Sequence, residues 1–203
     1  MAVYPSREWI EAVLQAAERS EEYKEAAKEW EGDFLCKIDS DQEFLADMER
    51  KEVVEGFMSF LDMMPVEVRT KYKGTPMGDV LEDKLGISLD ASMAGLDVDE
   101  VWRKMSGLSV EDFKGASLYF WADFWHGSVR NMTAVAPGDH EDAAFKLSGK
   151  FGNWKLLVSG QQDAVKLTMS NKLKLEGDLN YLMRRIRAVT VLSKEVFAGV
   201  PID

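Results

Sequence analysis

Residues 118–125 alternate strictly between two sets of side chains, and this period of two constrains the fold more firmly than any other feature of the chain. The two faces of the expected strand carry Leu118, Phe120, Ala122 and Phe124 on one side, and Tyr119, Trp121, Asp123 and Trp125 on the other. The next residues, 126–128, read His-Gly-Ser and are typical of a hairpin turn, after which residues 129–135 return. The chain therefore contains an antiparallel sheet.

Three further segments also alternate, and helical patterns surround them. Short strands are expected over residues 33–38, around Phe145 and Leu147, and over residues 173–175. Apolar side chains recur at helical spacing in five other segments, which are expected to begin after Ser6, after Ser20, near Asn153, near Asp163 and near Leu179, the last running to Phe197. We expect its apolar stripe to face inward, with the stripe residues being Leu179, Leu182, Met183, Ile186, Val189 and Val196.

Residues 39–114 differ in character, because helical patterns alternate with Gly and Pro and the segment holds seven of the eleven methionines. We interpret it as a helical insertion in a single domain that spans residues 1–203. Its methionines suit a lid, a dimer surface or plain packing, since Met is unbranched and adaptable. The pattern alone leaves these three roles open.

The composition excludes several classes of function. The formal charge of −11 repels nucleic acid and allows at most transient contact with an anionic membrane. Cys36 is the single cysteine, which excludes an internal disulfide and fits a reducing compartment. No apolar run reaches the length of a membrane span, and the N-terminus has no signal-peptide pattern, so we expect a cytoplasmic protein.

The stretch NKLKLEGDLNYLMRR, residues 171–185, alternates like a strand, turns at a glycine and restarts as a helix. It resembles the C-terminal signature of the sterol carrier protein type two, or sterol-transfer, family. That signature reads approximately Gly-Lys-Leu-Lys-Ile, one residue, Gly-Asp, and a helix rich in Leu and Met. The positions that match are Lys172, Leu173, Lys174, Gly177 and Asp178, whereas Asn171 stands where the family usually has glycine.

The resemblance covers most of residues 25–197, and GNWKLLVSGQQDAVKLTMSN looks like the paired helices that precede this signature. It implies an α+β fold in which a mostly antiparallel sheet of about five strands is covered by helices over an apolar tunnel. The lipid that such a tunnel holds is a fatty acid, acyl-CoA, phospholipid or sterol-like molecule. We expect the binding to be non-enzymatic and to need no cofactor or metal. The residues expected to contact the lipid are Phe120, Phe124, Phe145, Leu147, Leu157, Met169, Leu182, Met183 and Ile186.

Two other functions stay open. The Met-rich helices could bind a protein partner, as in an accessory or scaffold protein, and a homodimer is compatible with the sequence. A hydrolase on the same fold would need a nucleophile, but Cys36 lies on an inward face and His126 lies at a turn. His140 lacks the second histidine of a zinc-binding HExxH motif. The arginines at positions 184, 185 and 187 fit an exposed helix face, although they could also meet a carboxylate, a phosphate or a membrane.

Overall fold

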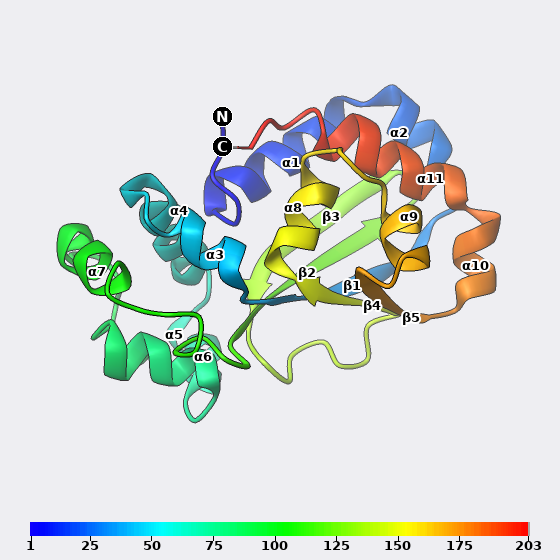
Figure 1. Ribbon diagram of the computed structural model, residues 1–203. Helices are drawn as coiled ribbons and strands as arrows, with labels where there is room; N and C mark the ends of the chain where they lie inside the picture. The colour runs from blue at the N-terminus through cyan, green and yellow to red at the C-terminus, as the bar shows by residue number, and fades with distance from the viewer. Residues whose placement is uncertain (203) are drawn as a thin grey trace.

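The structure is a computed structural model that describes residues 1–202. Five strands form one sheet (Figure 1): β1 (Glu31–Asp39), β2 (Ser117–Trp125), β3 (Ser128–Val135), β4 (Phe145–Lys150) and β5 (Leu173–Gly177). Their order is β3-β2-β1-β4-β5, and only the β1–β4 pair is parallel. The α+β class and the mostly antiparallel five-stranded sheet are confirmed.

Helices at the two ends of the chain cover one face of this sheet (Figure 1), and they are α1 (Arg7–Arg19), α2 (Glu21–Ala26), α8 (Phe151–Val158), α9 (Ala164–Met169), α11 (Ile186–Val191) and the π-helical turn η3 (Leu192–Phe197). Ser6 and Ser20 accept hydrogen bonds from the first-turn amides of α1 and α2, as their sequences predict. The chain termini meet at an Ala2–Ile202 bridge. Among the described residues, no helix is long and apolar enough to span a membrane.

The β2–β3 hairpin has the predicted faces. Phe120 and Phe124 are buried under the helices, and the alternate residues point to the opposite face, where the Trp121 ring stacks on His140. His126 and Gly127 make the turn with positive φ angles of 47° and 79°. This backbone matches the right-handed twist of the flanking strands, which is why a two-residue loop suffices.

Residues 40–116 connect β1 to β2 and lie beside the sheet's left end in Figure 1. They form the helices α3 (Gln42–Asp47), α4 (Lys51–Asp62), α5 (Val66–Arg69), α6 (Pro76–Asp79) and α7 (Val98–Met105), together with the 3-10 turn η1 (Thr70–Tyr72) and the π-helical turn η2 (Val80–Lys84). Asp41, Thr75 and Asp97 cap three of these helices. Their buried side chains belong to the same hydrophobic cluster as the sheet and its covering helices.

Six of the seven methionines in this segment are buried. Only Met63 is partly exposed, and none of the seven lines the apolar cavities described below. Of the roles considered for them, packing accounts for what the structure shows. They do not provide an exposed methionine surface for a protein partner.

The last predicted helix is wrong as a single element. The segment divides at Arg185, whose φ of −116° and ψ of 26° are not helical, into α10 (Leu179–Arg184) and α11 followed by η3. In Figure 1, α10 lies at the right-hand end of the sheet, and it packs on the protein through one side, with the Tyr181 ring against Trp30 and Phe145 and the Leu182 side chain buried. The expected inward stripe is therefore wrong for Leu179, Met183 and Ile186, which are exposed, and right for Leu182 and Val196, which are buried. The sixth stripe residue, Val189, is half-buried.

Candidate functional site

The candidate site begins with one row of side chains across the sheet. The strand registers align Phe120 with Cys36, Cys36 with Leu147, and Leu147 with Leu175. Neighbours in such a row lie on the same face of adjacent strands. The row therefore runs across β2, β1, β4 and β5, from beneath the covering helices to the edge of the sheet.

An inner cavity of about 70 Å³ lies between this face and the helices. Its walls are almost wholly hydrocarbon and aromatic, and the lining residues are Tyr23, Ala27, Trp30, Phe34, Cys36, Phe120, Ala122, Phe124, Met132, Leu147, Trp154, Leu157, Ala164, Ala188, Val189, Leu192, Ser193 and Phe197. The Ser193 hydroxyl donates to the Val189 carbonyl at 3.0 Å and is thereby satisfied within its own helix. The cavity thus favours an apolar occupant.

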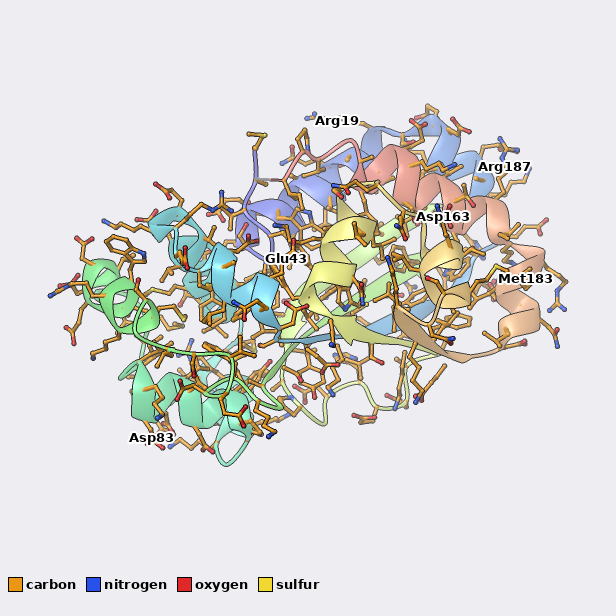
Figure 2. The ribbon with its side chains drawn as sticks, viewed as in Figure 1. Arg19, Glu43, Asp83, Asp163, Met183 and Arg187 are labelled. Atoms are coloured by element: carbon orange, nitrogen blue, oxygen red, sulfur yellow. The ribbon has the colours of Figure 1, made fainter. Side chains whose placement is uncertain are left out.

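An outer groove of about 210 Å³ continues toward the sheet edge, between β5 and the helices α9, α10 and α11. Its lining residues are Phe34, Leu147, Ala164, Val165, Thr168, Met169, Leu175, Leu179, Leu182, Met183, Ile186 and Val189. Figure 2 shows Met183 at the outer end of the molecule. The groove is apolar like the inner cavity, but several of its side chains reach the surface.

The two spaces have four lining residues in common: Phe34, Leu147, Ala164 and Val189. Phe34 and Leu147 belong to the sheet, whereas Ala164 and Val189 belong to the helices above it. The spaces are therefore neighbours that meet between α9, α11 and the β1–β4 pair. A bulky side chain at any of these four positions would obstruct the passage from one to the other.

Local sequence signals place the walls of the outer groove. Asp163 accepts from the Lys166 amide at 2.9 Å and begins α9, and Asp178 accepts from the Tyr181 amide at 3.0 Å and begins α10. Gly177 ends β5 with a φ of 131°, and a Cβ at this position would lie 2.5 Å from the Phe145 ring. The Gly-Asp pair of the sequence motif therefore fits both the close approach of Phe145 and the start of α10.

The site holds one thiol, and it is not poised for nucleophilic catalysis. Burial raises the pKa of Cys36 well above its usual value, so the unreactive thiol form prevails near neutral pH. His126 is bound to Glu31 at 2.7 Å on the exposed hairpin, about 17 Å along β1 from Cys36. The structure does not bring these two side chains together.

Eight of the nine predicted lipid-contacting residues line these spaces. Phe120, Phe124 and Leu157 line the inner cavity, and Leu147 lines both spaces. The outer groove adds Met169, Leu182, Met183 and Ile186. Phe145 lines neither, because its ring is buried against Phe34, Trp30 and Tyr181.

The sequence pattern did not single out several lining residues as part of the site. Ala164 and Ala188 leave room because their side chains are short, and Cys36 reads in sequence as an ordinary buried residue. The signal that the sequence offered for the two alanines was a small apolar residue among the larger ones on the buried side of a helix. That signal cannot by itself separate a cavity from close packing.

Two larger hollows lie at the surface and have a different character. One, of about 480 Å³, is lined by Asp41, Glu43, Lys150 and Lys155 among others, and a second, of about 350 Å³, lies beside the chain termini. Ligand sites are mostly apolar with a few placed polar groups, so volume alone does not make either one the better candidate. No group of three or more potential metal-ligating side chains occurs within residues 1–202.

One family model matches the chain. The model of the SCP-2 sterol transfer family matches residues 87–189, which is about half of the chain. No curated protein sequence matches. The matched residues include β2 to β5 and the helices α8 to α10 that border the cavities.

Two solved structures share the fold. A crystal structure of sterol carrier protein 2 is 18% identical, with a TM-score of 0.54 over 95% of this chain and 95% of that chain. The solution structure of a conserved hypothetical protein from Thermus thermophilus, described as possibly a sterol carrier protein, is also 18% identical, with a TM-score of 0.55 over 100% of this chain and 97% of that chain. At this identity the likeness establishes the architecture, which extends through the helical segment between β1 and β2.

Proposed function

Because the chain belongs to the SCP-2 sterol transfer family, we propose that it binds a long-chain lipid, with the apolar chain of the lipid in the inner cavity and outer groove. The observation that carries this proposal is the pair of apolar spaces that meet at Phe34, Leu147, Ala164 and Val189. Together they would form a tunnel from the exposed edge of the sheet to the space beneath α8 and η3.

The shape of these spaces favours a single extended acyl chain over a rigid ring system. Sites for drug-sized ligands usually measure about 300–1,000 Å³, and both spaces are smaller than that. Each buried methylene contributes about 0.8 kcal/mol, so about eight of them contribute about 6 kcal/mol before the costs of ordering. A slender chain gains this energy with small side-chain movements, whereas a fused-ring sterol requires the walls to separate further.

Both spaces are apolar, so the exposure of the outer groove to solvent fixes the orientation that we propose. The methyl end would lie near Phe120 and Leu157, where the walls are apolar. The polar head would stay at the outer groove, near Met169 and Met183, because burying an unpaired polar group costs several kcal/mol. The lining residues of both spaces include no carboxylate and no imidazole, so nothing in the walls provides a general base. We therefore propose a binding or transfer role without catalysis.

Protection of Cys36 tests this function, because its thiol lines the inner cavity. The native protein is treated at mildly alkaline pH with a small methanethiolsulfonate reagent, and the modification rate is followed by mass spectrometry. We expect slow modification, since the raised pKa keeps the thiol protonated, and palmitate should slow it further by about tenfold. Butyrate, which is too short to reach the cavity, is the matched control.

The outcomes separate the parts of the proposal. Equal protection by cholesterol would refute the preference for an acyl chain and leave lipid binding intact. If palmitate and cholesterol both fail to protect Cys36, and neither binds in equilibrium dialysis, the lipid-binding function is wrong. Turnover of an acyl ester that is lost in Cys36→Ala would refute the non-catalytic role.

A further inference from the structure

The mouth of the outer groove carries an exposed apolar cluster, which we call the mouth cluster. Its members and their exposed fractions are Met169 at 81%, Leu179 at 54%, Met183 at 60% and Ile186 at 37%. All four line the outer groove, so they are neighbours on the surface. They are half of the eight large hydrophobic residues that are exposed in the described chain, and such a concentration marks an interaction surface.

The charge around the mouth cluster is opposite to that of the whole chain. Residues 164–187 contain six basic and two acidic residues, a formal charge of +4, although the whole chain carries −11. Figure 2 places Arg187 at the same end of the molecule as Met183, with Asp83 at the opposite end. The segment that bears the cluster is therefore basic, although α2, which packs against α11, is acidic and carries Glu21, Glu22 and Glu25 against a single Lys24.

Some of these cations have no partner within residues 1–202. The side chains of Lys166 and Arg184 form no ion pair or hydrogen bond there, whereas the largely exposed Arg187 forms a long ion pair with Glu22 at 3.9 Å. Arg185 differs, because its guanidinium lies over the Tyr181 ring at 4.0 Å. Lys166 and Arg184 beside the mouth are thus available to an external anion.

Acidic groups near the mouth reduce this charge without cancelling it, because residues 163–187 together hold six basic and three acidic residues. Asp178 is occupied in capping α10, Asp163 caps α9, and Glu176 lies 2.6 Å from Lys174 on the edge strand. These carboxylates already have partners inside the protein. On α2, Glu21, Glu25 and Glu22 pair with Lys24, Lys28 and Arg187 respectively. On α9 and α10, the helices that border the mouth, the charged side chains left without a partner among residues 1–202 are Lys166 and Arg184.

We infer that the mouth cluster docks on the surface of an anionic lipid bilayer. Exposed apolar side chains flanked by Lys and Arg are the composition of elements that lie in the headgroup region, where each cation contributes through the surface potential. A second copy of this chain fits less well, because a two-fold contact at this face would bring the +4 segments together. One consequence rests on the proposed function: docking would let a lipid pass between the bilayer and the outer groove without crossing water.

Vesicle co-sedimentation of the full chain tests the docking surface. We expect binding to vesicles of three parts phosphatidylcholine and one part phosphatidylserine, little binding to pure phosphatidylcholine, and weakening by salt. Arg184→Glu should weaken binding to the anionic vesicles by about tenfold. The matched control Arg103→Glu, on α7 at the other end of the molecule (Figure 1), should bind like the wild type.

A second pair of variants tests the apolar part. Met183→Gln should weaken vesicle binding severalfold, whereas Val110→Gln, which changes an exposed apolar residue outside the mouth, should not. Thermal melting verifies that all four variants fold. Wild-type binding that ignores phosphatidylserine, or equal loss from Arg184→Glu and Arg103→Glu, would overturn the inference.

Two further measurements distinguish membrane docking from dimerisation and from the proposed lipid site. A concentration-dependent dimer in sedimentation velocity that Met183→Gln abolishes would assign the mouth cluster to a second copy and overturn membrane docking. Palmitate protection of Cys36 is measured in the absence of vesicles. If palmitate protects Cys36 but the protein does not bind vesicles, the docking inference is wrong and the proposed lipid site stands. If the protein binds vesicles but palmitate does not protect Cys36, the proposed lipid site is wrong and the docking inference stands.

Discussion

Val189→Trp is expected to weaken the binding of long-chain fatty acids by about two orders of magnitude. Val189 lines both the inner cavity and the outer groove, so an indole at this position would fill their junction. Excluding about four methylenes from the inner cavity costs about 3 kcal/mol, or a factor of about 150 in affinity. Because the indole would enter existing space, we expect the free energy of unfolding to change by less than about 1 kcal/mol.

Val191→Trp is the matched control, since Val191 lies on the same helix, is buried, and lines neither space. Overpacking there should cost about 1–3 kcal/mol of stability. Fatty-acid titration and thermal unfolding of both variants provide the comparison. Unchanged affinity in a folded Val189→Trp protein would show that the chain does not pass this junction.

Trp9→Ala is expected to produce the largest loss of stability, about 3–5 kcal/mol. The fully buried Trp9 ring packs edge-on against Tyr4 at 4.7 Å and lies 6.2 Å from Phe120 on the sheet and 6.1 Å from Phe197 on η3. Its indole nitrogen has no partner within residues 1–202, so the loss arises from packing and not from a broken hydrogen bond. Calorimetry should show a melting temperature lower by about 6–20 °C.

Trp125→Ala removes the same volume from the opposite face of the sheet. Trp125 is 38% exposed, and its ring contacts Arg130 and His126. We expect a cost of about 1 kcal/mol or less. Equal losses from the two substitutions would contradict the assignment of the core to the helix-covered face.

The strands and their faces could be predicted because a sheet with one covered face imposes a period of two on the sequence. The alternation through Phe120 and Phe124 gave the buried face of β2, and His126-Gly127 gave the turn. Helix starts were equally readable, since Ser6 and Asp178 accept from first-turn amides by local geometry. These features depend on residues close together in sequence.

The break at Arg185 could not be predicted from local pattern. The apolar spacing continues from α10 through α11, and the sequence shows no Pro or Gly there. The fold decides which side chains are buried, because α10 packs on the end of the sheet through one side only, while α11 lies over the sheet (Figure 1). The same apolar spacing therefore yields the exposed Met183 on one side of the break and the buried Ala188 on the other.

The cavities were predictable only through the family resemblance. A row such as Cys36 and Leu147 reads as ordinary core, and whether space remains above it depends on helices from distant parts of the chain. Ala164 and Ala188 create that space by lacking side-chain atoms, which leaves no hydrophobic signal. The roles of the methionines were open for a similar reason, since a buried and an exposed Met share one sequence pattern.

Paramagnetic broadening by spin-labelled stearic acid tests the central claim most directly. With a nitroxide near the methyl end of the lipid, we predict broadened NMR signals from the methyl groups of Leu157 and Leu192, which line the inner cavity. With the nitroxide near the carboxyl end, the broadened signals should be those of Leu179 and Met183 at the mouth, and Leu85 of the helical segment should be unaffected throughout. Broadening confined to the mouth for both labels, or centred on Leu85, would contradict an acyl chain held between the sheet and its covering helices.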